Sequence, residues 1–181
     1  NNPNVLVGYR NTLFYVIFGT LINLSMTSLG AYCVTRKRFA IKTPMLIMVT
    51  ITMFFSGGLI PTFTLIKSLG LYNTVWAILL PGAISSWNLI IMKTFFQGLP
   101  DALEESAMID GANDWHVFTR IILPLSKPVI AVMVLYYGVA HWNSWFQAMI
   151  YLRDRSMFPL QLFLREVLML NGNASGQTPT V

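Results

Sequence analysis

Cysteine and histidine are nearly absent from this 181-residue chain. Cys33 is the only cysteine, so neither a disulfide nor a cysteine-based metal site can form within the chain. The two histidines, His116 and His141, are far apart in sequence and lie in segments of different character. The sequence therefore predicts no catalytic, cofactor-binding or metal-binding site built from these residue types.

Charge is scarce as well. Charged residues make up 10% of the chain, whereas a soluble domain carries about 25%. Hydrophobic residues make up 55%, including ten Met, twelve Phe and five Trp. A soluble core is a poor fit to that much apolar surface, and apolar stripes are more often packed core than a cofactor site. The composition therefore favours helices packed in a bilayer.

The two ends of the chain lack the features of natural termini. The start, Asn1-Asn2-Pro3, has no Met, no charged leading segment and no cleavage pattern, so it is not a signal peptide. Residues 171–181 have the composition of a loop. We expect the chain to be a fragment of a longer protein.

Four long runs contain no Lys, Arg, Asp or Glu: residues 11–35, 43–66, 68–92 and 128–152. Each is long enough to cross a bilayer as a helix, which takes roughly 20 apolar residues. None shows the alternating polarity of a barrel strand, and a helix satisfies its own backbone groups in lipid. Because Gly70, Tyr72 and Asn73 indicate a turn, the third helix is expected to begin near Thr74. The predicted fold is an all-α membrane protein, a polytopic transmembrane helix bundle with spans at about 11–35, 43–66, 74–93 and 128–152.

Glycine and proline interrupt two of these runs. Gly57-Gly58 and Pro61 fall in the second half of the second run, and Pro81-Gly82 falls within the third. One interpretation is packing kinks, which neighbouring helices tolerate by covering the freed backbone. The other interpretation is hinges that line a transport pathway, and the sequence leaves both open.

Basic residues predict the orientation in the membrane. One side collects Arg36, Lys37, Arg38, Lys42, Lys93, Arg120 and Lys127, and the other collects Arg10, Lys67, Arg153, Arg155 and Arg165. Short cytoplasmic loops carry the excess of Lys and Arg. The first group, which includes the Arg36–Arg38 cluster, is therefore expected in the cytoplasm together with the polar hairpin at 99–126.

That hairpin is the most polar part of the chain. It holds five of the seven acidic residues: Asp101, Glu104, Glu105, Asp110 and Asp114. Pro100 and Asp101 suit the start of a helix, where acidic residues meet the positive end of the dipole. Gly111 suits a helix end that needs a left-handed residue, and Asn113 suits the N-cap of a second helix.

The second helix of the hairpin carries an apolar face. Trp115, Phe118 and Ile122 recur at helical spacing, and Leu123-Pro124 is expected to end the helix. A helix–turn–helix also invites a nucleic-acid interpretation, but the first helix is acidic and phosphate binding requires clustered Lys and Arg. The remaining alternative at this point is an ordinary polar loop with capped helices.

The residue spacing adds a resemblance to a known family. Glu105-Ser106-Ala107, Gly111, Ile121 and Leu123-Pro124 resemble the EAA loop of the membrane subunits of ABC importers. The longer pattern is similar to carbohydrate-uptake permeases of the maltose type: Asp110-Gly111-Ala112, Phe118, Leu125, Pro128, and outside the hairpin Asn11-Thr12-Leu13, Gly30-Ala31-Tyr32, Arg36, Leu69-Gly70-Leu71, Asn73-Thr74 and Trp76. Ser106 stands where the family has Ala, which keeps a small residue there.

The resemblance implies the ABC importer permease fold and a mechanism. The chain would hold about four of the family's six helices, and residues 157–170 look most like the variant linked to complex oligosaccharides or uronide-type sugars. The hairpin would dock on a separate cytoplasmic ATPase dimer, with apolar anchors at Trp115 and Phe118 inside a charged rim. The implied coupling residues are Glu105, Ser106, Ala107, Asp110, Gly111, Ala112, Trp115, Phe118, Leu123 and Pro124.

The resemblance also implies the partners. No Gly-rich nucleotide loop occurs, since Lys67-Ser68 follows Ile66 rather than Gly. The chain would therefore be a transport subunit and no enzyme, with ATP and Mg bound on the ATPase. A second permease subunit, an extracytoplasmic sugar-binding protein and membrane lipid complete the implied partners, and nucleic acid is not among them. The location would be a bacterial cytoplasmic membrane.

Polar and aromatic residues within the spans are candidates for the substrate pathway. They are Trp87, Asn88, Tyr136, Trp142 and Asn143, with Tyr137, His141 and Trp145 nearby. Aromatic faces and amides suit the ring faces and hydroxyls of sugars. The alternative is structural, because Trp and Tyr form interfacial belts and buried Asn ties helices together.

Two other functions compete with the permease hypothesis. An ion-driven secondary transporter usually holds an ionisable residue inside a span, and His141 is the only candidate here. A non-transporting membrane scaffold whose hairpin binds a cytoplasmic partner stays open on sequence alone.

Overall fold

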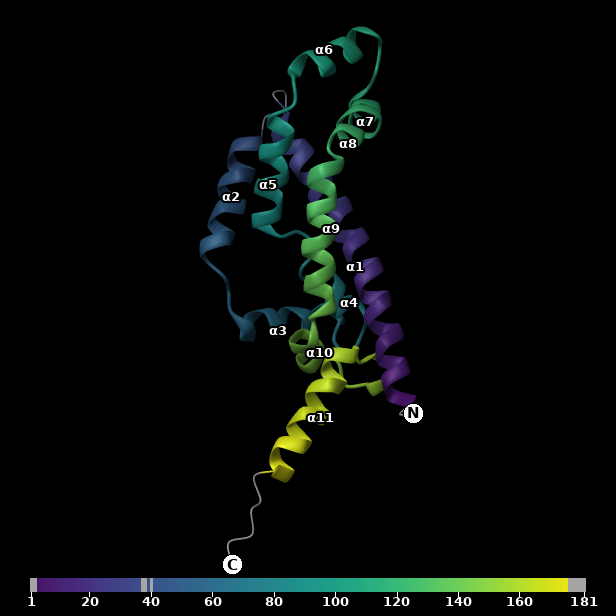
Figure 1. Ribbon diagram of the computed structural model, residues 1–181. Helices are drawn as coiled ribbons and strands as arrows, with labels where there is room; N and C mark the ends of the chain where they lie inside the picture. Colours follow the sequence, from purple (N-terminus) through teal and green to yellow (C-terminus); the bar gives the residue numbers. More distant parts are fainter. Residues whose placement is uncertain (1–2, 37–38, 40, 176–181) are drawn as a thin grey trace, which may run out of the picture. The chain divides into compact units, whose positions relative to one another are not determined.

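The computed structural model describes residues 3–36, 39 and 41–175, and all regular structure in that part of the chain is helical (Figure 1). The chain forms two compact units. The first unit combines Asn1–Thr20, Gly58–Pro81 and Tyr137–Val181, and the second combines Leu21–Gly57 and Gly82–Tyr136. Each unit is assembled from segments far apart in sequence.

Helix α1 (Pro3–Thr35) contributes residues to both units and contains the first predicted span. It buries small polar side chains such as Thr12, Asn23 and Thr27, and it exposes large apolar ones such as Leu6. Small polar residues allow close helix packing, whereas exposed apolar residues suit lipid. Within the described residues, Val5–Thr35 is the one helix long and apolar enough to cross a membrane alone.

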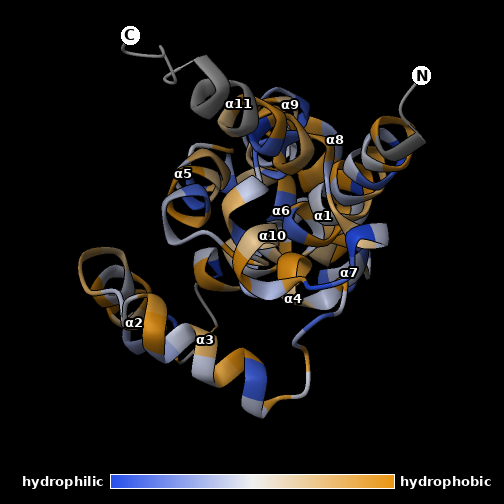
Figure 2. Ribbon diagram, turned by 90° about the horizontal axis from the view of Figure 1, so that it is seen from below, coloured by the Kyte–Doolittle hydropathy of each residue, from blue (hydrophilic) through white to orange (hydrophobic). Residues whose placement is uncertain are grey.

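The second predicted span is divided into α2 (Lys42–Phe54) and α3 (Leu59–Ser68). Gly58 has φ +81°, a conformation that favours glycine, and it directly precedes α3. Pro61 does not interrupt a helix as expected, because it lies in the first turn of α3, where its missing N–H is harmless. Apolar residues predominate along α2 (Figure 2), yet none of its side chains is buried.

The third predicted span is also divided. Helix α4 (Trp76–Leu79) ends just before Pro81. Helix α5 (Ser86–Gln97) is capped at its start by Ser85, whose side chain accepts a hydrogen bond from the Asn88 N–H. Proline supplies no N–H and disfavours helical backbone in the residue before it, which accounts for the break. Helix α5 continues past Lys93 to Gln97.

The fourth predicted span comprises α9 (Lys127–Trp142) and α10 (Trp145–Tyr151). The 3₁₀ turn η2 (Arg155–Met157) and helix α11 (Leu160–Ser175) follow. The loop expected at 171–181 is wrong for residues 171–175, which continue α11, and residues 176–181 lie outside the described part of the chain. Helices α2 with α3, and α7–α8 with α9, reach the length of a membrane span only when each broken pair is taken together.

In the first unit, the turn at residues 70–73 is hydrogen-bonded to the chain at the end of α10. The backbone N–H of Asn73 donates to the Tyr151 carbonyl at 2.9 Å, and Asn73 Oδ1 accepts from the N–H groups of Arg153 at 2.8 Å and Asp154 at 3.0 Å. Asn73 has φ +58°, which asparagine tolerates better than most residues. The turn predicted at Gly70–Asn73 therefore also caps the end of α10.

Candidate functional site

The first helix of the hairpin, α6 (Asp101–Ile109), ends in a Schellman motif at Gly111. The N–H of Gly111 donates to the Met108 carbonyl at 3.1 Å, and the N–H of Ala112 donates to the Ala107 carbonyl at 2.9 Å. Gly111 has φ +85°, as the sequence predicted. Asp101 and Glu104 lie in the first turn of α6, where the helix dipole favours negative charge.

The second helix begins as predicted at Asn113, whose side chain accepts a hydrogen bond from the His116 N–H at 2.8 Å. Helix α7 (Asp114–Val117), the π-turn η1 (Phe118–Ile122) and α8 (Leu123–Leu125) form one helical stretch. Leu123-Pro124 does not end it, because helical structure runs to Leu125. Pro124 lacks an N–H and its ring crowds the carbonyl four residues earlier, which explains the wide turn just before it.

Replacing Asn113 by alanine should loosen the second helix. The N-cap hydrogen bond is lost, which costs about 1 kcal/mol. Hydrogen exchange of the full-length protein should show faster exchange at residues 115–118. Asn143→Ala is the matched control, since that amide lies outside the hairpin and donates to the Val139 carbonyl near the end of α9. Equal acceleration at 115–118 in both variants would contradict the capping role.

The hairpin is seated on the end of α1 through aromatic contacts. Phe118 and Ile122 are buried, and the Phe118 ring lies 4.8 Å from the Tyr32 ring, centroid to centroid. The Tyr32 hydroxyl donates to the Asp114 carbonyl at 2.9 Å. Phe118 therefore fastens the hairpin to α1, and its ring also lies 5.8 Å from the Trp115 ring, centroid to centroid. Its ring is buried, and a docking role for Phe118 beside Trp115 stays a prediction.

Arg36 adds a charged contact to this seat. Its guanidinium lies 3.9 Å above the Tyr32 ring and forms an ion pair with Glu104. Burial lowers the pKa of Arg36, while negative groups such as Asp114 and Asp101 oppose that shift. Arginine stays protonated in proteins, so the contact holds at physiological pH. These groups border a cavity of about 740 Å³ between α1, α5 and the hairpin.

Sequence reasoning counted Arg36 only as a sign of orientation and did not place Tyr32 in the site. The signal available was charge complementarity, because a basic loop end and an acidic hairpin attract each other across a short distance. The pairing itself depends on α1 ending beside α6, which no local pattern indicates.

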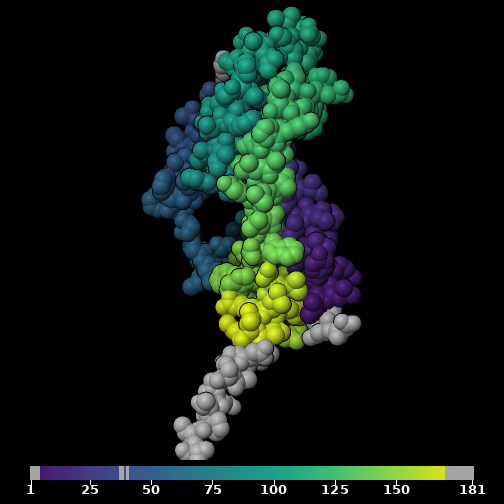
Figure 3. All heavy atoms as spheres, viewed as in Figure 1, coloured from purple at the N-terminus to yellow at the C-terminus, as the bar shows by residue number. Residues whose placement is uncertain are grey.

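Several predicted coupling residues remain on the surface of the hairpin, which appears in teal and green in Figure 3. Trp115 is 63% exposed, and Ile109, which was not among the predicted coupling residues, is 86% exposed. Glu105, Ser106, Asp110, Gly111 and Pro124 are also exposed, whereas Ala107, Ala112 and Leu123 are half-buried. The exposed apolar pair Ile109 and Trp115 brackets the Gly111 turn, so the turn carries apolar groups within an acidic rim.

The candidate substrate residues fall in both units. Asn88 is buried in the first turn of α5, and Trp87 and Tyr136 are exposed, all in the second unit. Trp142 and Asn143 belong to the first unit. The Trp142 ring packs edge-on against the Tyr9 ring at 6.4 Å, and the amide of Asn143, just after α9, donates to the Val139 carbonyl at 2.9 Å.

Nearby residues in the first unit are similarly placed. Tyr137 and His141 are buried, and the Arg165 guanidinium lies 3.6 Å over the Trp145 ring. These contacts fit a structural role. A substrate role for any of these residues stays a prediction.

Helices that pair exposed apolar surfaces with a polar, capped hairpin define a membrane component. Residues 5–144 match the family described as the binding-protein-dependent transport system inner membrane component. The chain belongs to this family. The resemblance found in the sequence and the all-α permease fold are thereby confirmed.

Individual relatives agree with this assignment. The chain is 44% identical over 165 residues to the polygalacturonan/rhamnogalacturonan transport system permease protein YtcP of Bacillus subtilis, covering 91% of this chain and 58% of YtcP. It is 46% identical over 171 residues to protein LplC of the same organism, covering 94% of this chain and 58% of LplC. The chain thus spans less than two thirds of the length of these relatives.

A solved structure agrees as well. The crystal structure of a bacterial ABC transporter involved in import of the acidic polysaccharide alginate matches with a TM-score of 0.90 and 32% identity. The match covers 92% of this chain and 59% of that chain. The arrangement of helices described above is therefore that of an ABC importer subunit.

Proposed function

We propose that the full-length protein is the permease subunit of an ABC importer that moves a sugar or oligosaccharide across the cytoplasmic membrane. The relatives YtcP and the alginate importer carry polygalacturonan, rhamnogalacturonan and alginate in their names, which favours an acidic, uronide-containing oligosaccharide. An ion-driven transporter and a non-transporting scaffold are not favoured by these relatives.

One observation carries the coupling proposal: a rigid hairpin exposes Ile109 and Trp115 while its inner face is locked to α1. Exposed tryptophan is typical of docking hot spots, and the Gly111 turn fixes the angle between its two helices. An ATPase that grips Ile109 and Trp115 would move the hairpin as a rigid body. The Phe118–Tyr32 contact and the Arg36–Glu104 ion pair would pass that motion to α1.

In this proposal the other components of the transporter are separate chains. ATP and Mg are held by the cytoplasmic ATPase dimer, and the present chain supplies no ATPase site. A second permease subunit completes the pathway, and an extracytoplasmic binding protein delivers the sugar. The hairpin lies in the cytoplasm, in agreement with the basic residues on its side of the spans.

Trp115→Ala in the full-length transporter should weaken association with the ATPase by about 30-fold, because truncating a hot-spot residue costs about 2 kcal/mol. Co-purification and substrate-stimulated ATP hydrolysis in vesicles measure the effect. Trp76→Ala is the matched control, since Trp76 is 51% exposed on α4, outside the hairpin. Unchanged association in Trp115→Ala would count against docking through this turn.

The substrate class has a separate test. Vesicles that contain the whole transporter should hydrolyse ATP faster with an oligogalacturonide and its binding protein than with a neutral maltooligosaccharide. Equal stimulation by both would contradict the acidic substrate, and uptake driven by an ion gradient without ATP would contradict the ABC mechanism.

A further inference from the structure

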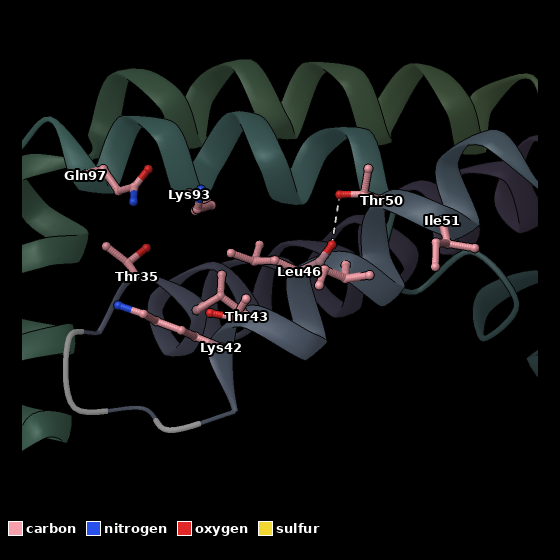
Figure 4. A pocket seen from close by; sticks show the side chains of 10 residues that line it. Thr35, Lys42, Thr43, Leu46, Thr50, Ile51, Lys93 and Gln97 are labelled. Carbon is pink, nitrogen blue, oxygen red and sulfur yellow. Dashed lines mark hydrogen bonds between the residues drawn. The ribbon is translucent and has the colours of Figure 1, made fainter.

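A pocket of about 350 Å³ lies within the second unit, between the end of α1, helix α2 and helix α5 (Figure 4). Thr35, Lys42 and Gln97 lie toward one end of it, with Lys93 close to Gln97. Thr50 and Ile51 lie toward the other end. The pocket thus has a polar end and a more apolar end.

The charge at the polar end is of one sign. Lys42 and Lys93 line the pocket, and none of the described residues that line it is a carboxylate. Among the residues that the structure describes, neither lysine forms an ion pair. Lys42 also borders the acid-lined cavity beneath the hairpin, whereas Lys93 borders this pocket alone. The site therefore attracts an anion, and Lys93 is the residue that reports on it specifically.

The polar end offers the two lysine ammonium groups and the side-chain amide of Gln97 as donors. The Thr35 hydroxyl donates to the Ala31 carbonyl at 2.6 Å, and the Thr50 hydroxyl donates to the Leu46 carbonyl at 2.8 Å, so both hydroxyl protons are committed within their helices. Lysine is a strong point-charge binder of phosphate. Two ammonium groups in a pocket lined by no described carboxylate suit a phosphate oxygen rather than a cation.

The position along the helices indicates the source of the phosphate. Thr35 ends the uncharged run at 11–35, Lys42 precedes the run at 43–66, and Lys93 follows the run at 68–92. The polar end of the pocket therefore lies where three apolar segments stop, which is headgroup level for a bilayer. Away from the polar end, the pocket is lined by three apolar residues of α2: Leu46, Ile47 and Ile51. Ile47 and Ile51 are each about half exposed.

We propose that this pocket binds one anionic phospholipid, with its phosphate held by Lys42 and Lys93 and an acyl chain along Leu46, Ile47 and Ile51. Basic pockets between transmembrane helices on the cytoplasmic side bind anionic headgroups in other membrane proteins. A lipid bound here bridges the ends of three helices next to the hairpin. The proposal needs the membrane location of the family and is independent of the transported sugar.

Native mass spectrometry of the full-length permease in detergent, titrated with phosphatidylglycerol or phosphatidylcholine, tests the proposal. We expect selective retention of phosphatidylglycerol. Lys93→Gln should weaken its binding about fivefold, since a basic residue near an anionic lipid contributes about 1 kcal/mol, and Lys93→Arg should restore most of it. Lys67→Gln, which removes an exposed lysine on α3, is the matched control and should leave binding unchanged.

Three results would overturn the proposal. Equal retention of both lipids would remove the charge selectivity, and an equal loss in Lys67→Gln and Lys93→Gln would show a general charge effect. Displacement of the lipid by millimolar inorganic phosphate would make free phosphate the ligand. If Lys93→Gln does not elute as a single folded species, Lys42→Gln provides the same test and should show the same fivefold loss.

Discussion

Gly111→Val should abolish substrate-stimulated ATP hydrolysis by the assembled transporter while the protein still inserts in the membrane. Gly111 has φ +85°, and a β-branched residue at positive φ is a genuine outlier. Such strain costs about 1–3 kcal/mol. The Schellman motif would open to relieve it, and the angle between α6 and α7 would change. The measurements are ATPase stimulation in vesicles and the amount of protein in the membrane.

Two matched controls separate coupling from general strain. Gly70→Val imposes the same kind of strain at φ +70° outside the hairpin, and no atom lies within 4 Å of the added Cβ at either glycine. Gly82→Val adds the same side chain in open space without a positive φ. We expect both controls to retain ATPase stimulation. A Gly111→Val transporter that imports substrate at the wild-type rate would refute the coupling role of this turn.

Gly8→Leu should destabilise the first unit by about 1–3 kcal/mol, the usual cost of overpacking. A Cβ at Gly8 would lie 2.8 Å from the Phe163 ring and 3.1 Å from the Leu160 Cα. The backbone there cannot retreat easily, because the Leu160 N–H donates to Thr12 Oγ1 at 2.9 Å. Thermal unfolding of the full-length protein in detergent should show a lower midpoint, by about 2–4 °C per kcal/mol.

The same prediction can be tested with a smaller change, Gly8→Ala, for which Gly138→Ala is the control. At Gly138 the nearest atom to an added Cβ is Thr20 Oγ1 at 3.9 Å, an ordinary contact. Alanine also favours helix over glycine by up to about 1 kcal/mol. Gly138→Ala should therefore leave the midpoint unchanged or raise it, whereas Gly8→Ala should lower it. A midpoint raised equally in both variants would show that α1 and α11 do not pack closely at Gly8.

The local features of the hairpin could be predicted because each depends on residues near in sequence. The left-handed Gly111 and the Asn113 cap follow from backbone sterics and from one side chain bonding its own helix. The continuation of the helix past Pro124 could not be predicted as readily, because a wide π-turn absorbs the missing N–H. Helix breaks at Gly58 and before Pro81 were indicated by residue type, although the exact ends of α3 and α5 were not.

The inner and outer faces of the hairpin were less predictable. Trp115 and Phe118 are both aromatic and are three residues apart, so periodicity groups them together. The two rings do touch, 5.8 Å apart between centroids, but only Phe118 is buried, against Tyr32 on α1, while Trp115 stays exposed. The five substrate candidates also share a chemical character, and they are divided between the two units.

The sequence by itself determined the membrane character of the chain, the helical class, the capped polar hairpin and the family. These properties depend on composition, on uncharged runs and on short-range spacing, which are all visible in the sequence without knowledge of contacts between distant residues. Only the tertiary structure decided that Tyr32 and Arg36 hold the hairpin, that Phe118 is buried, and that Lys42 and Lys93 share one pocket. Those outcomes depend on which helix ends meet in space, since contacts between distant segments are set by packing and not by local pattern.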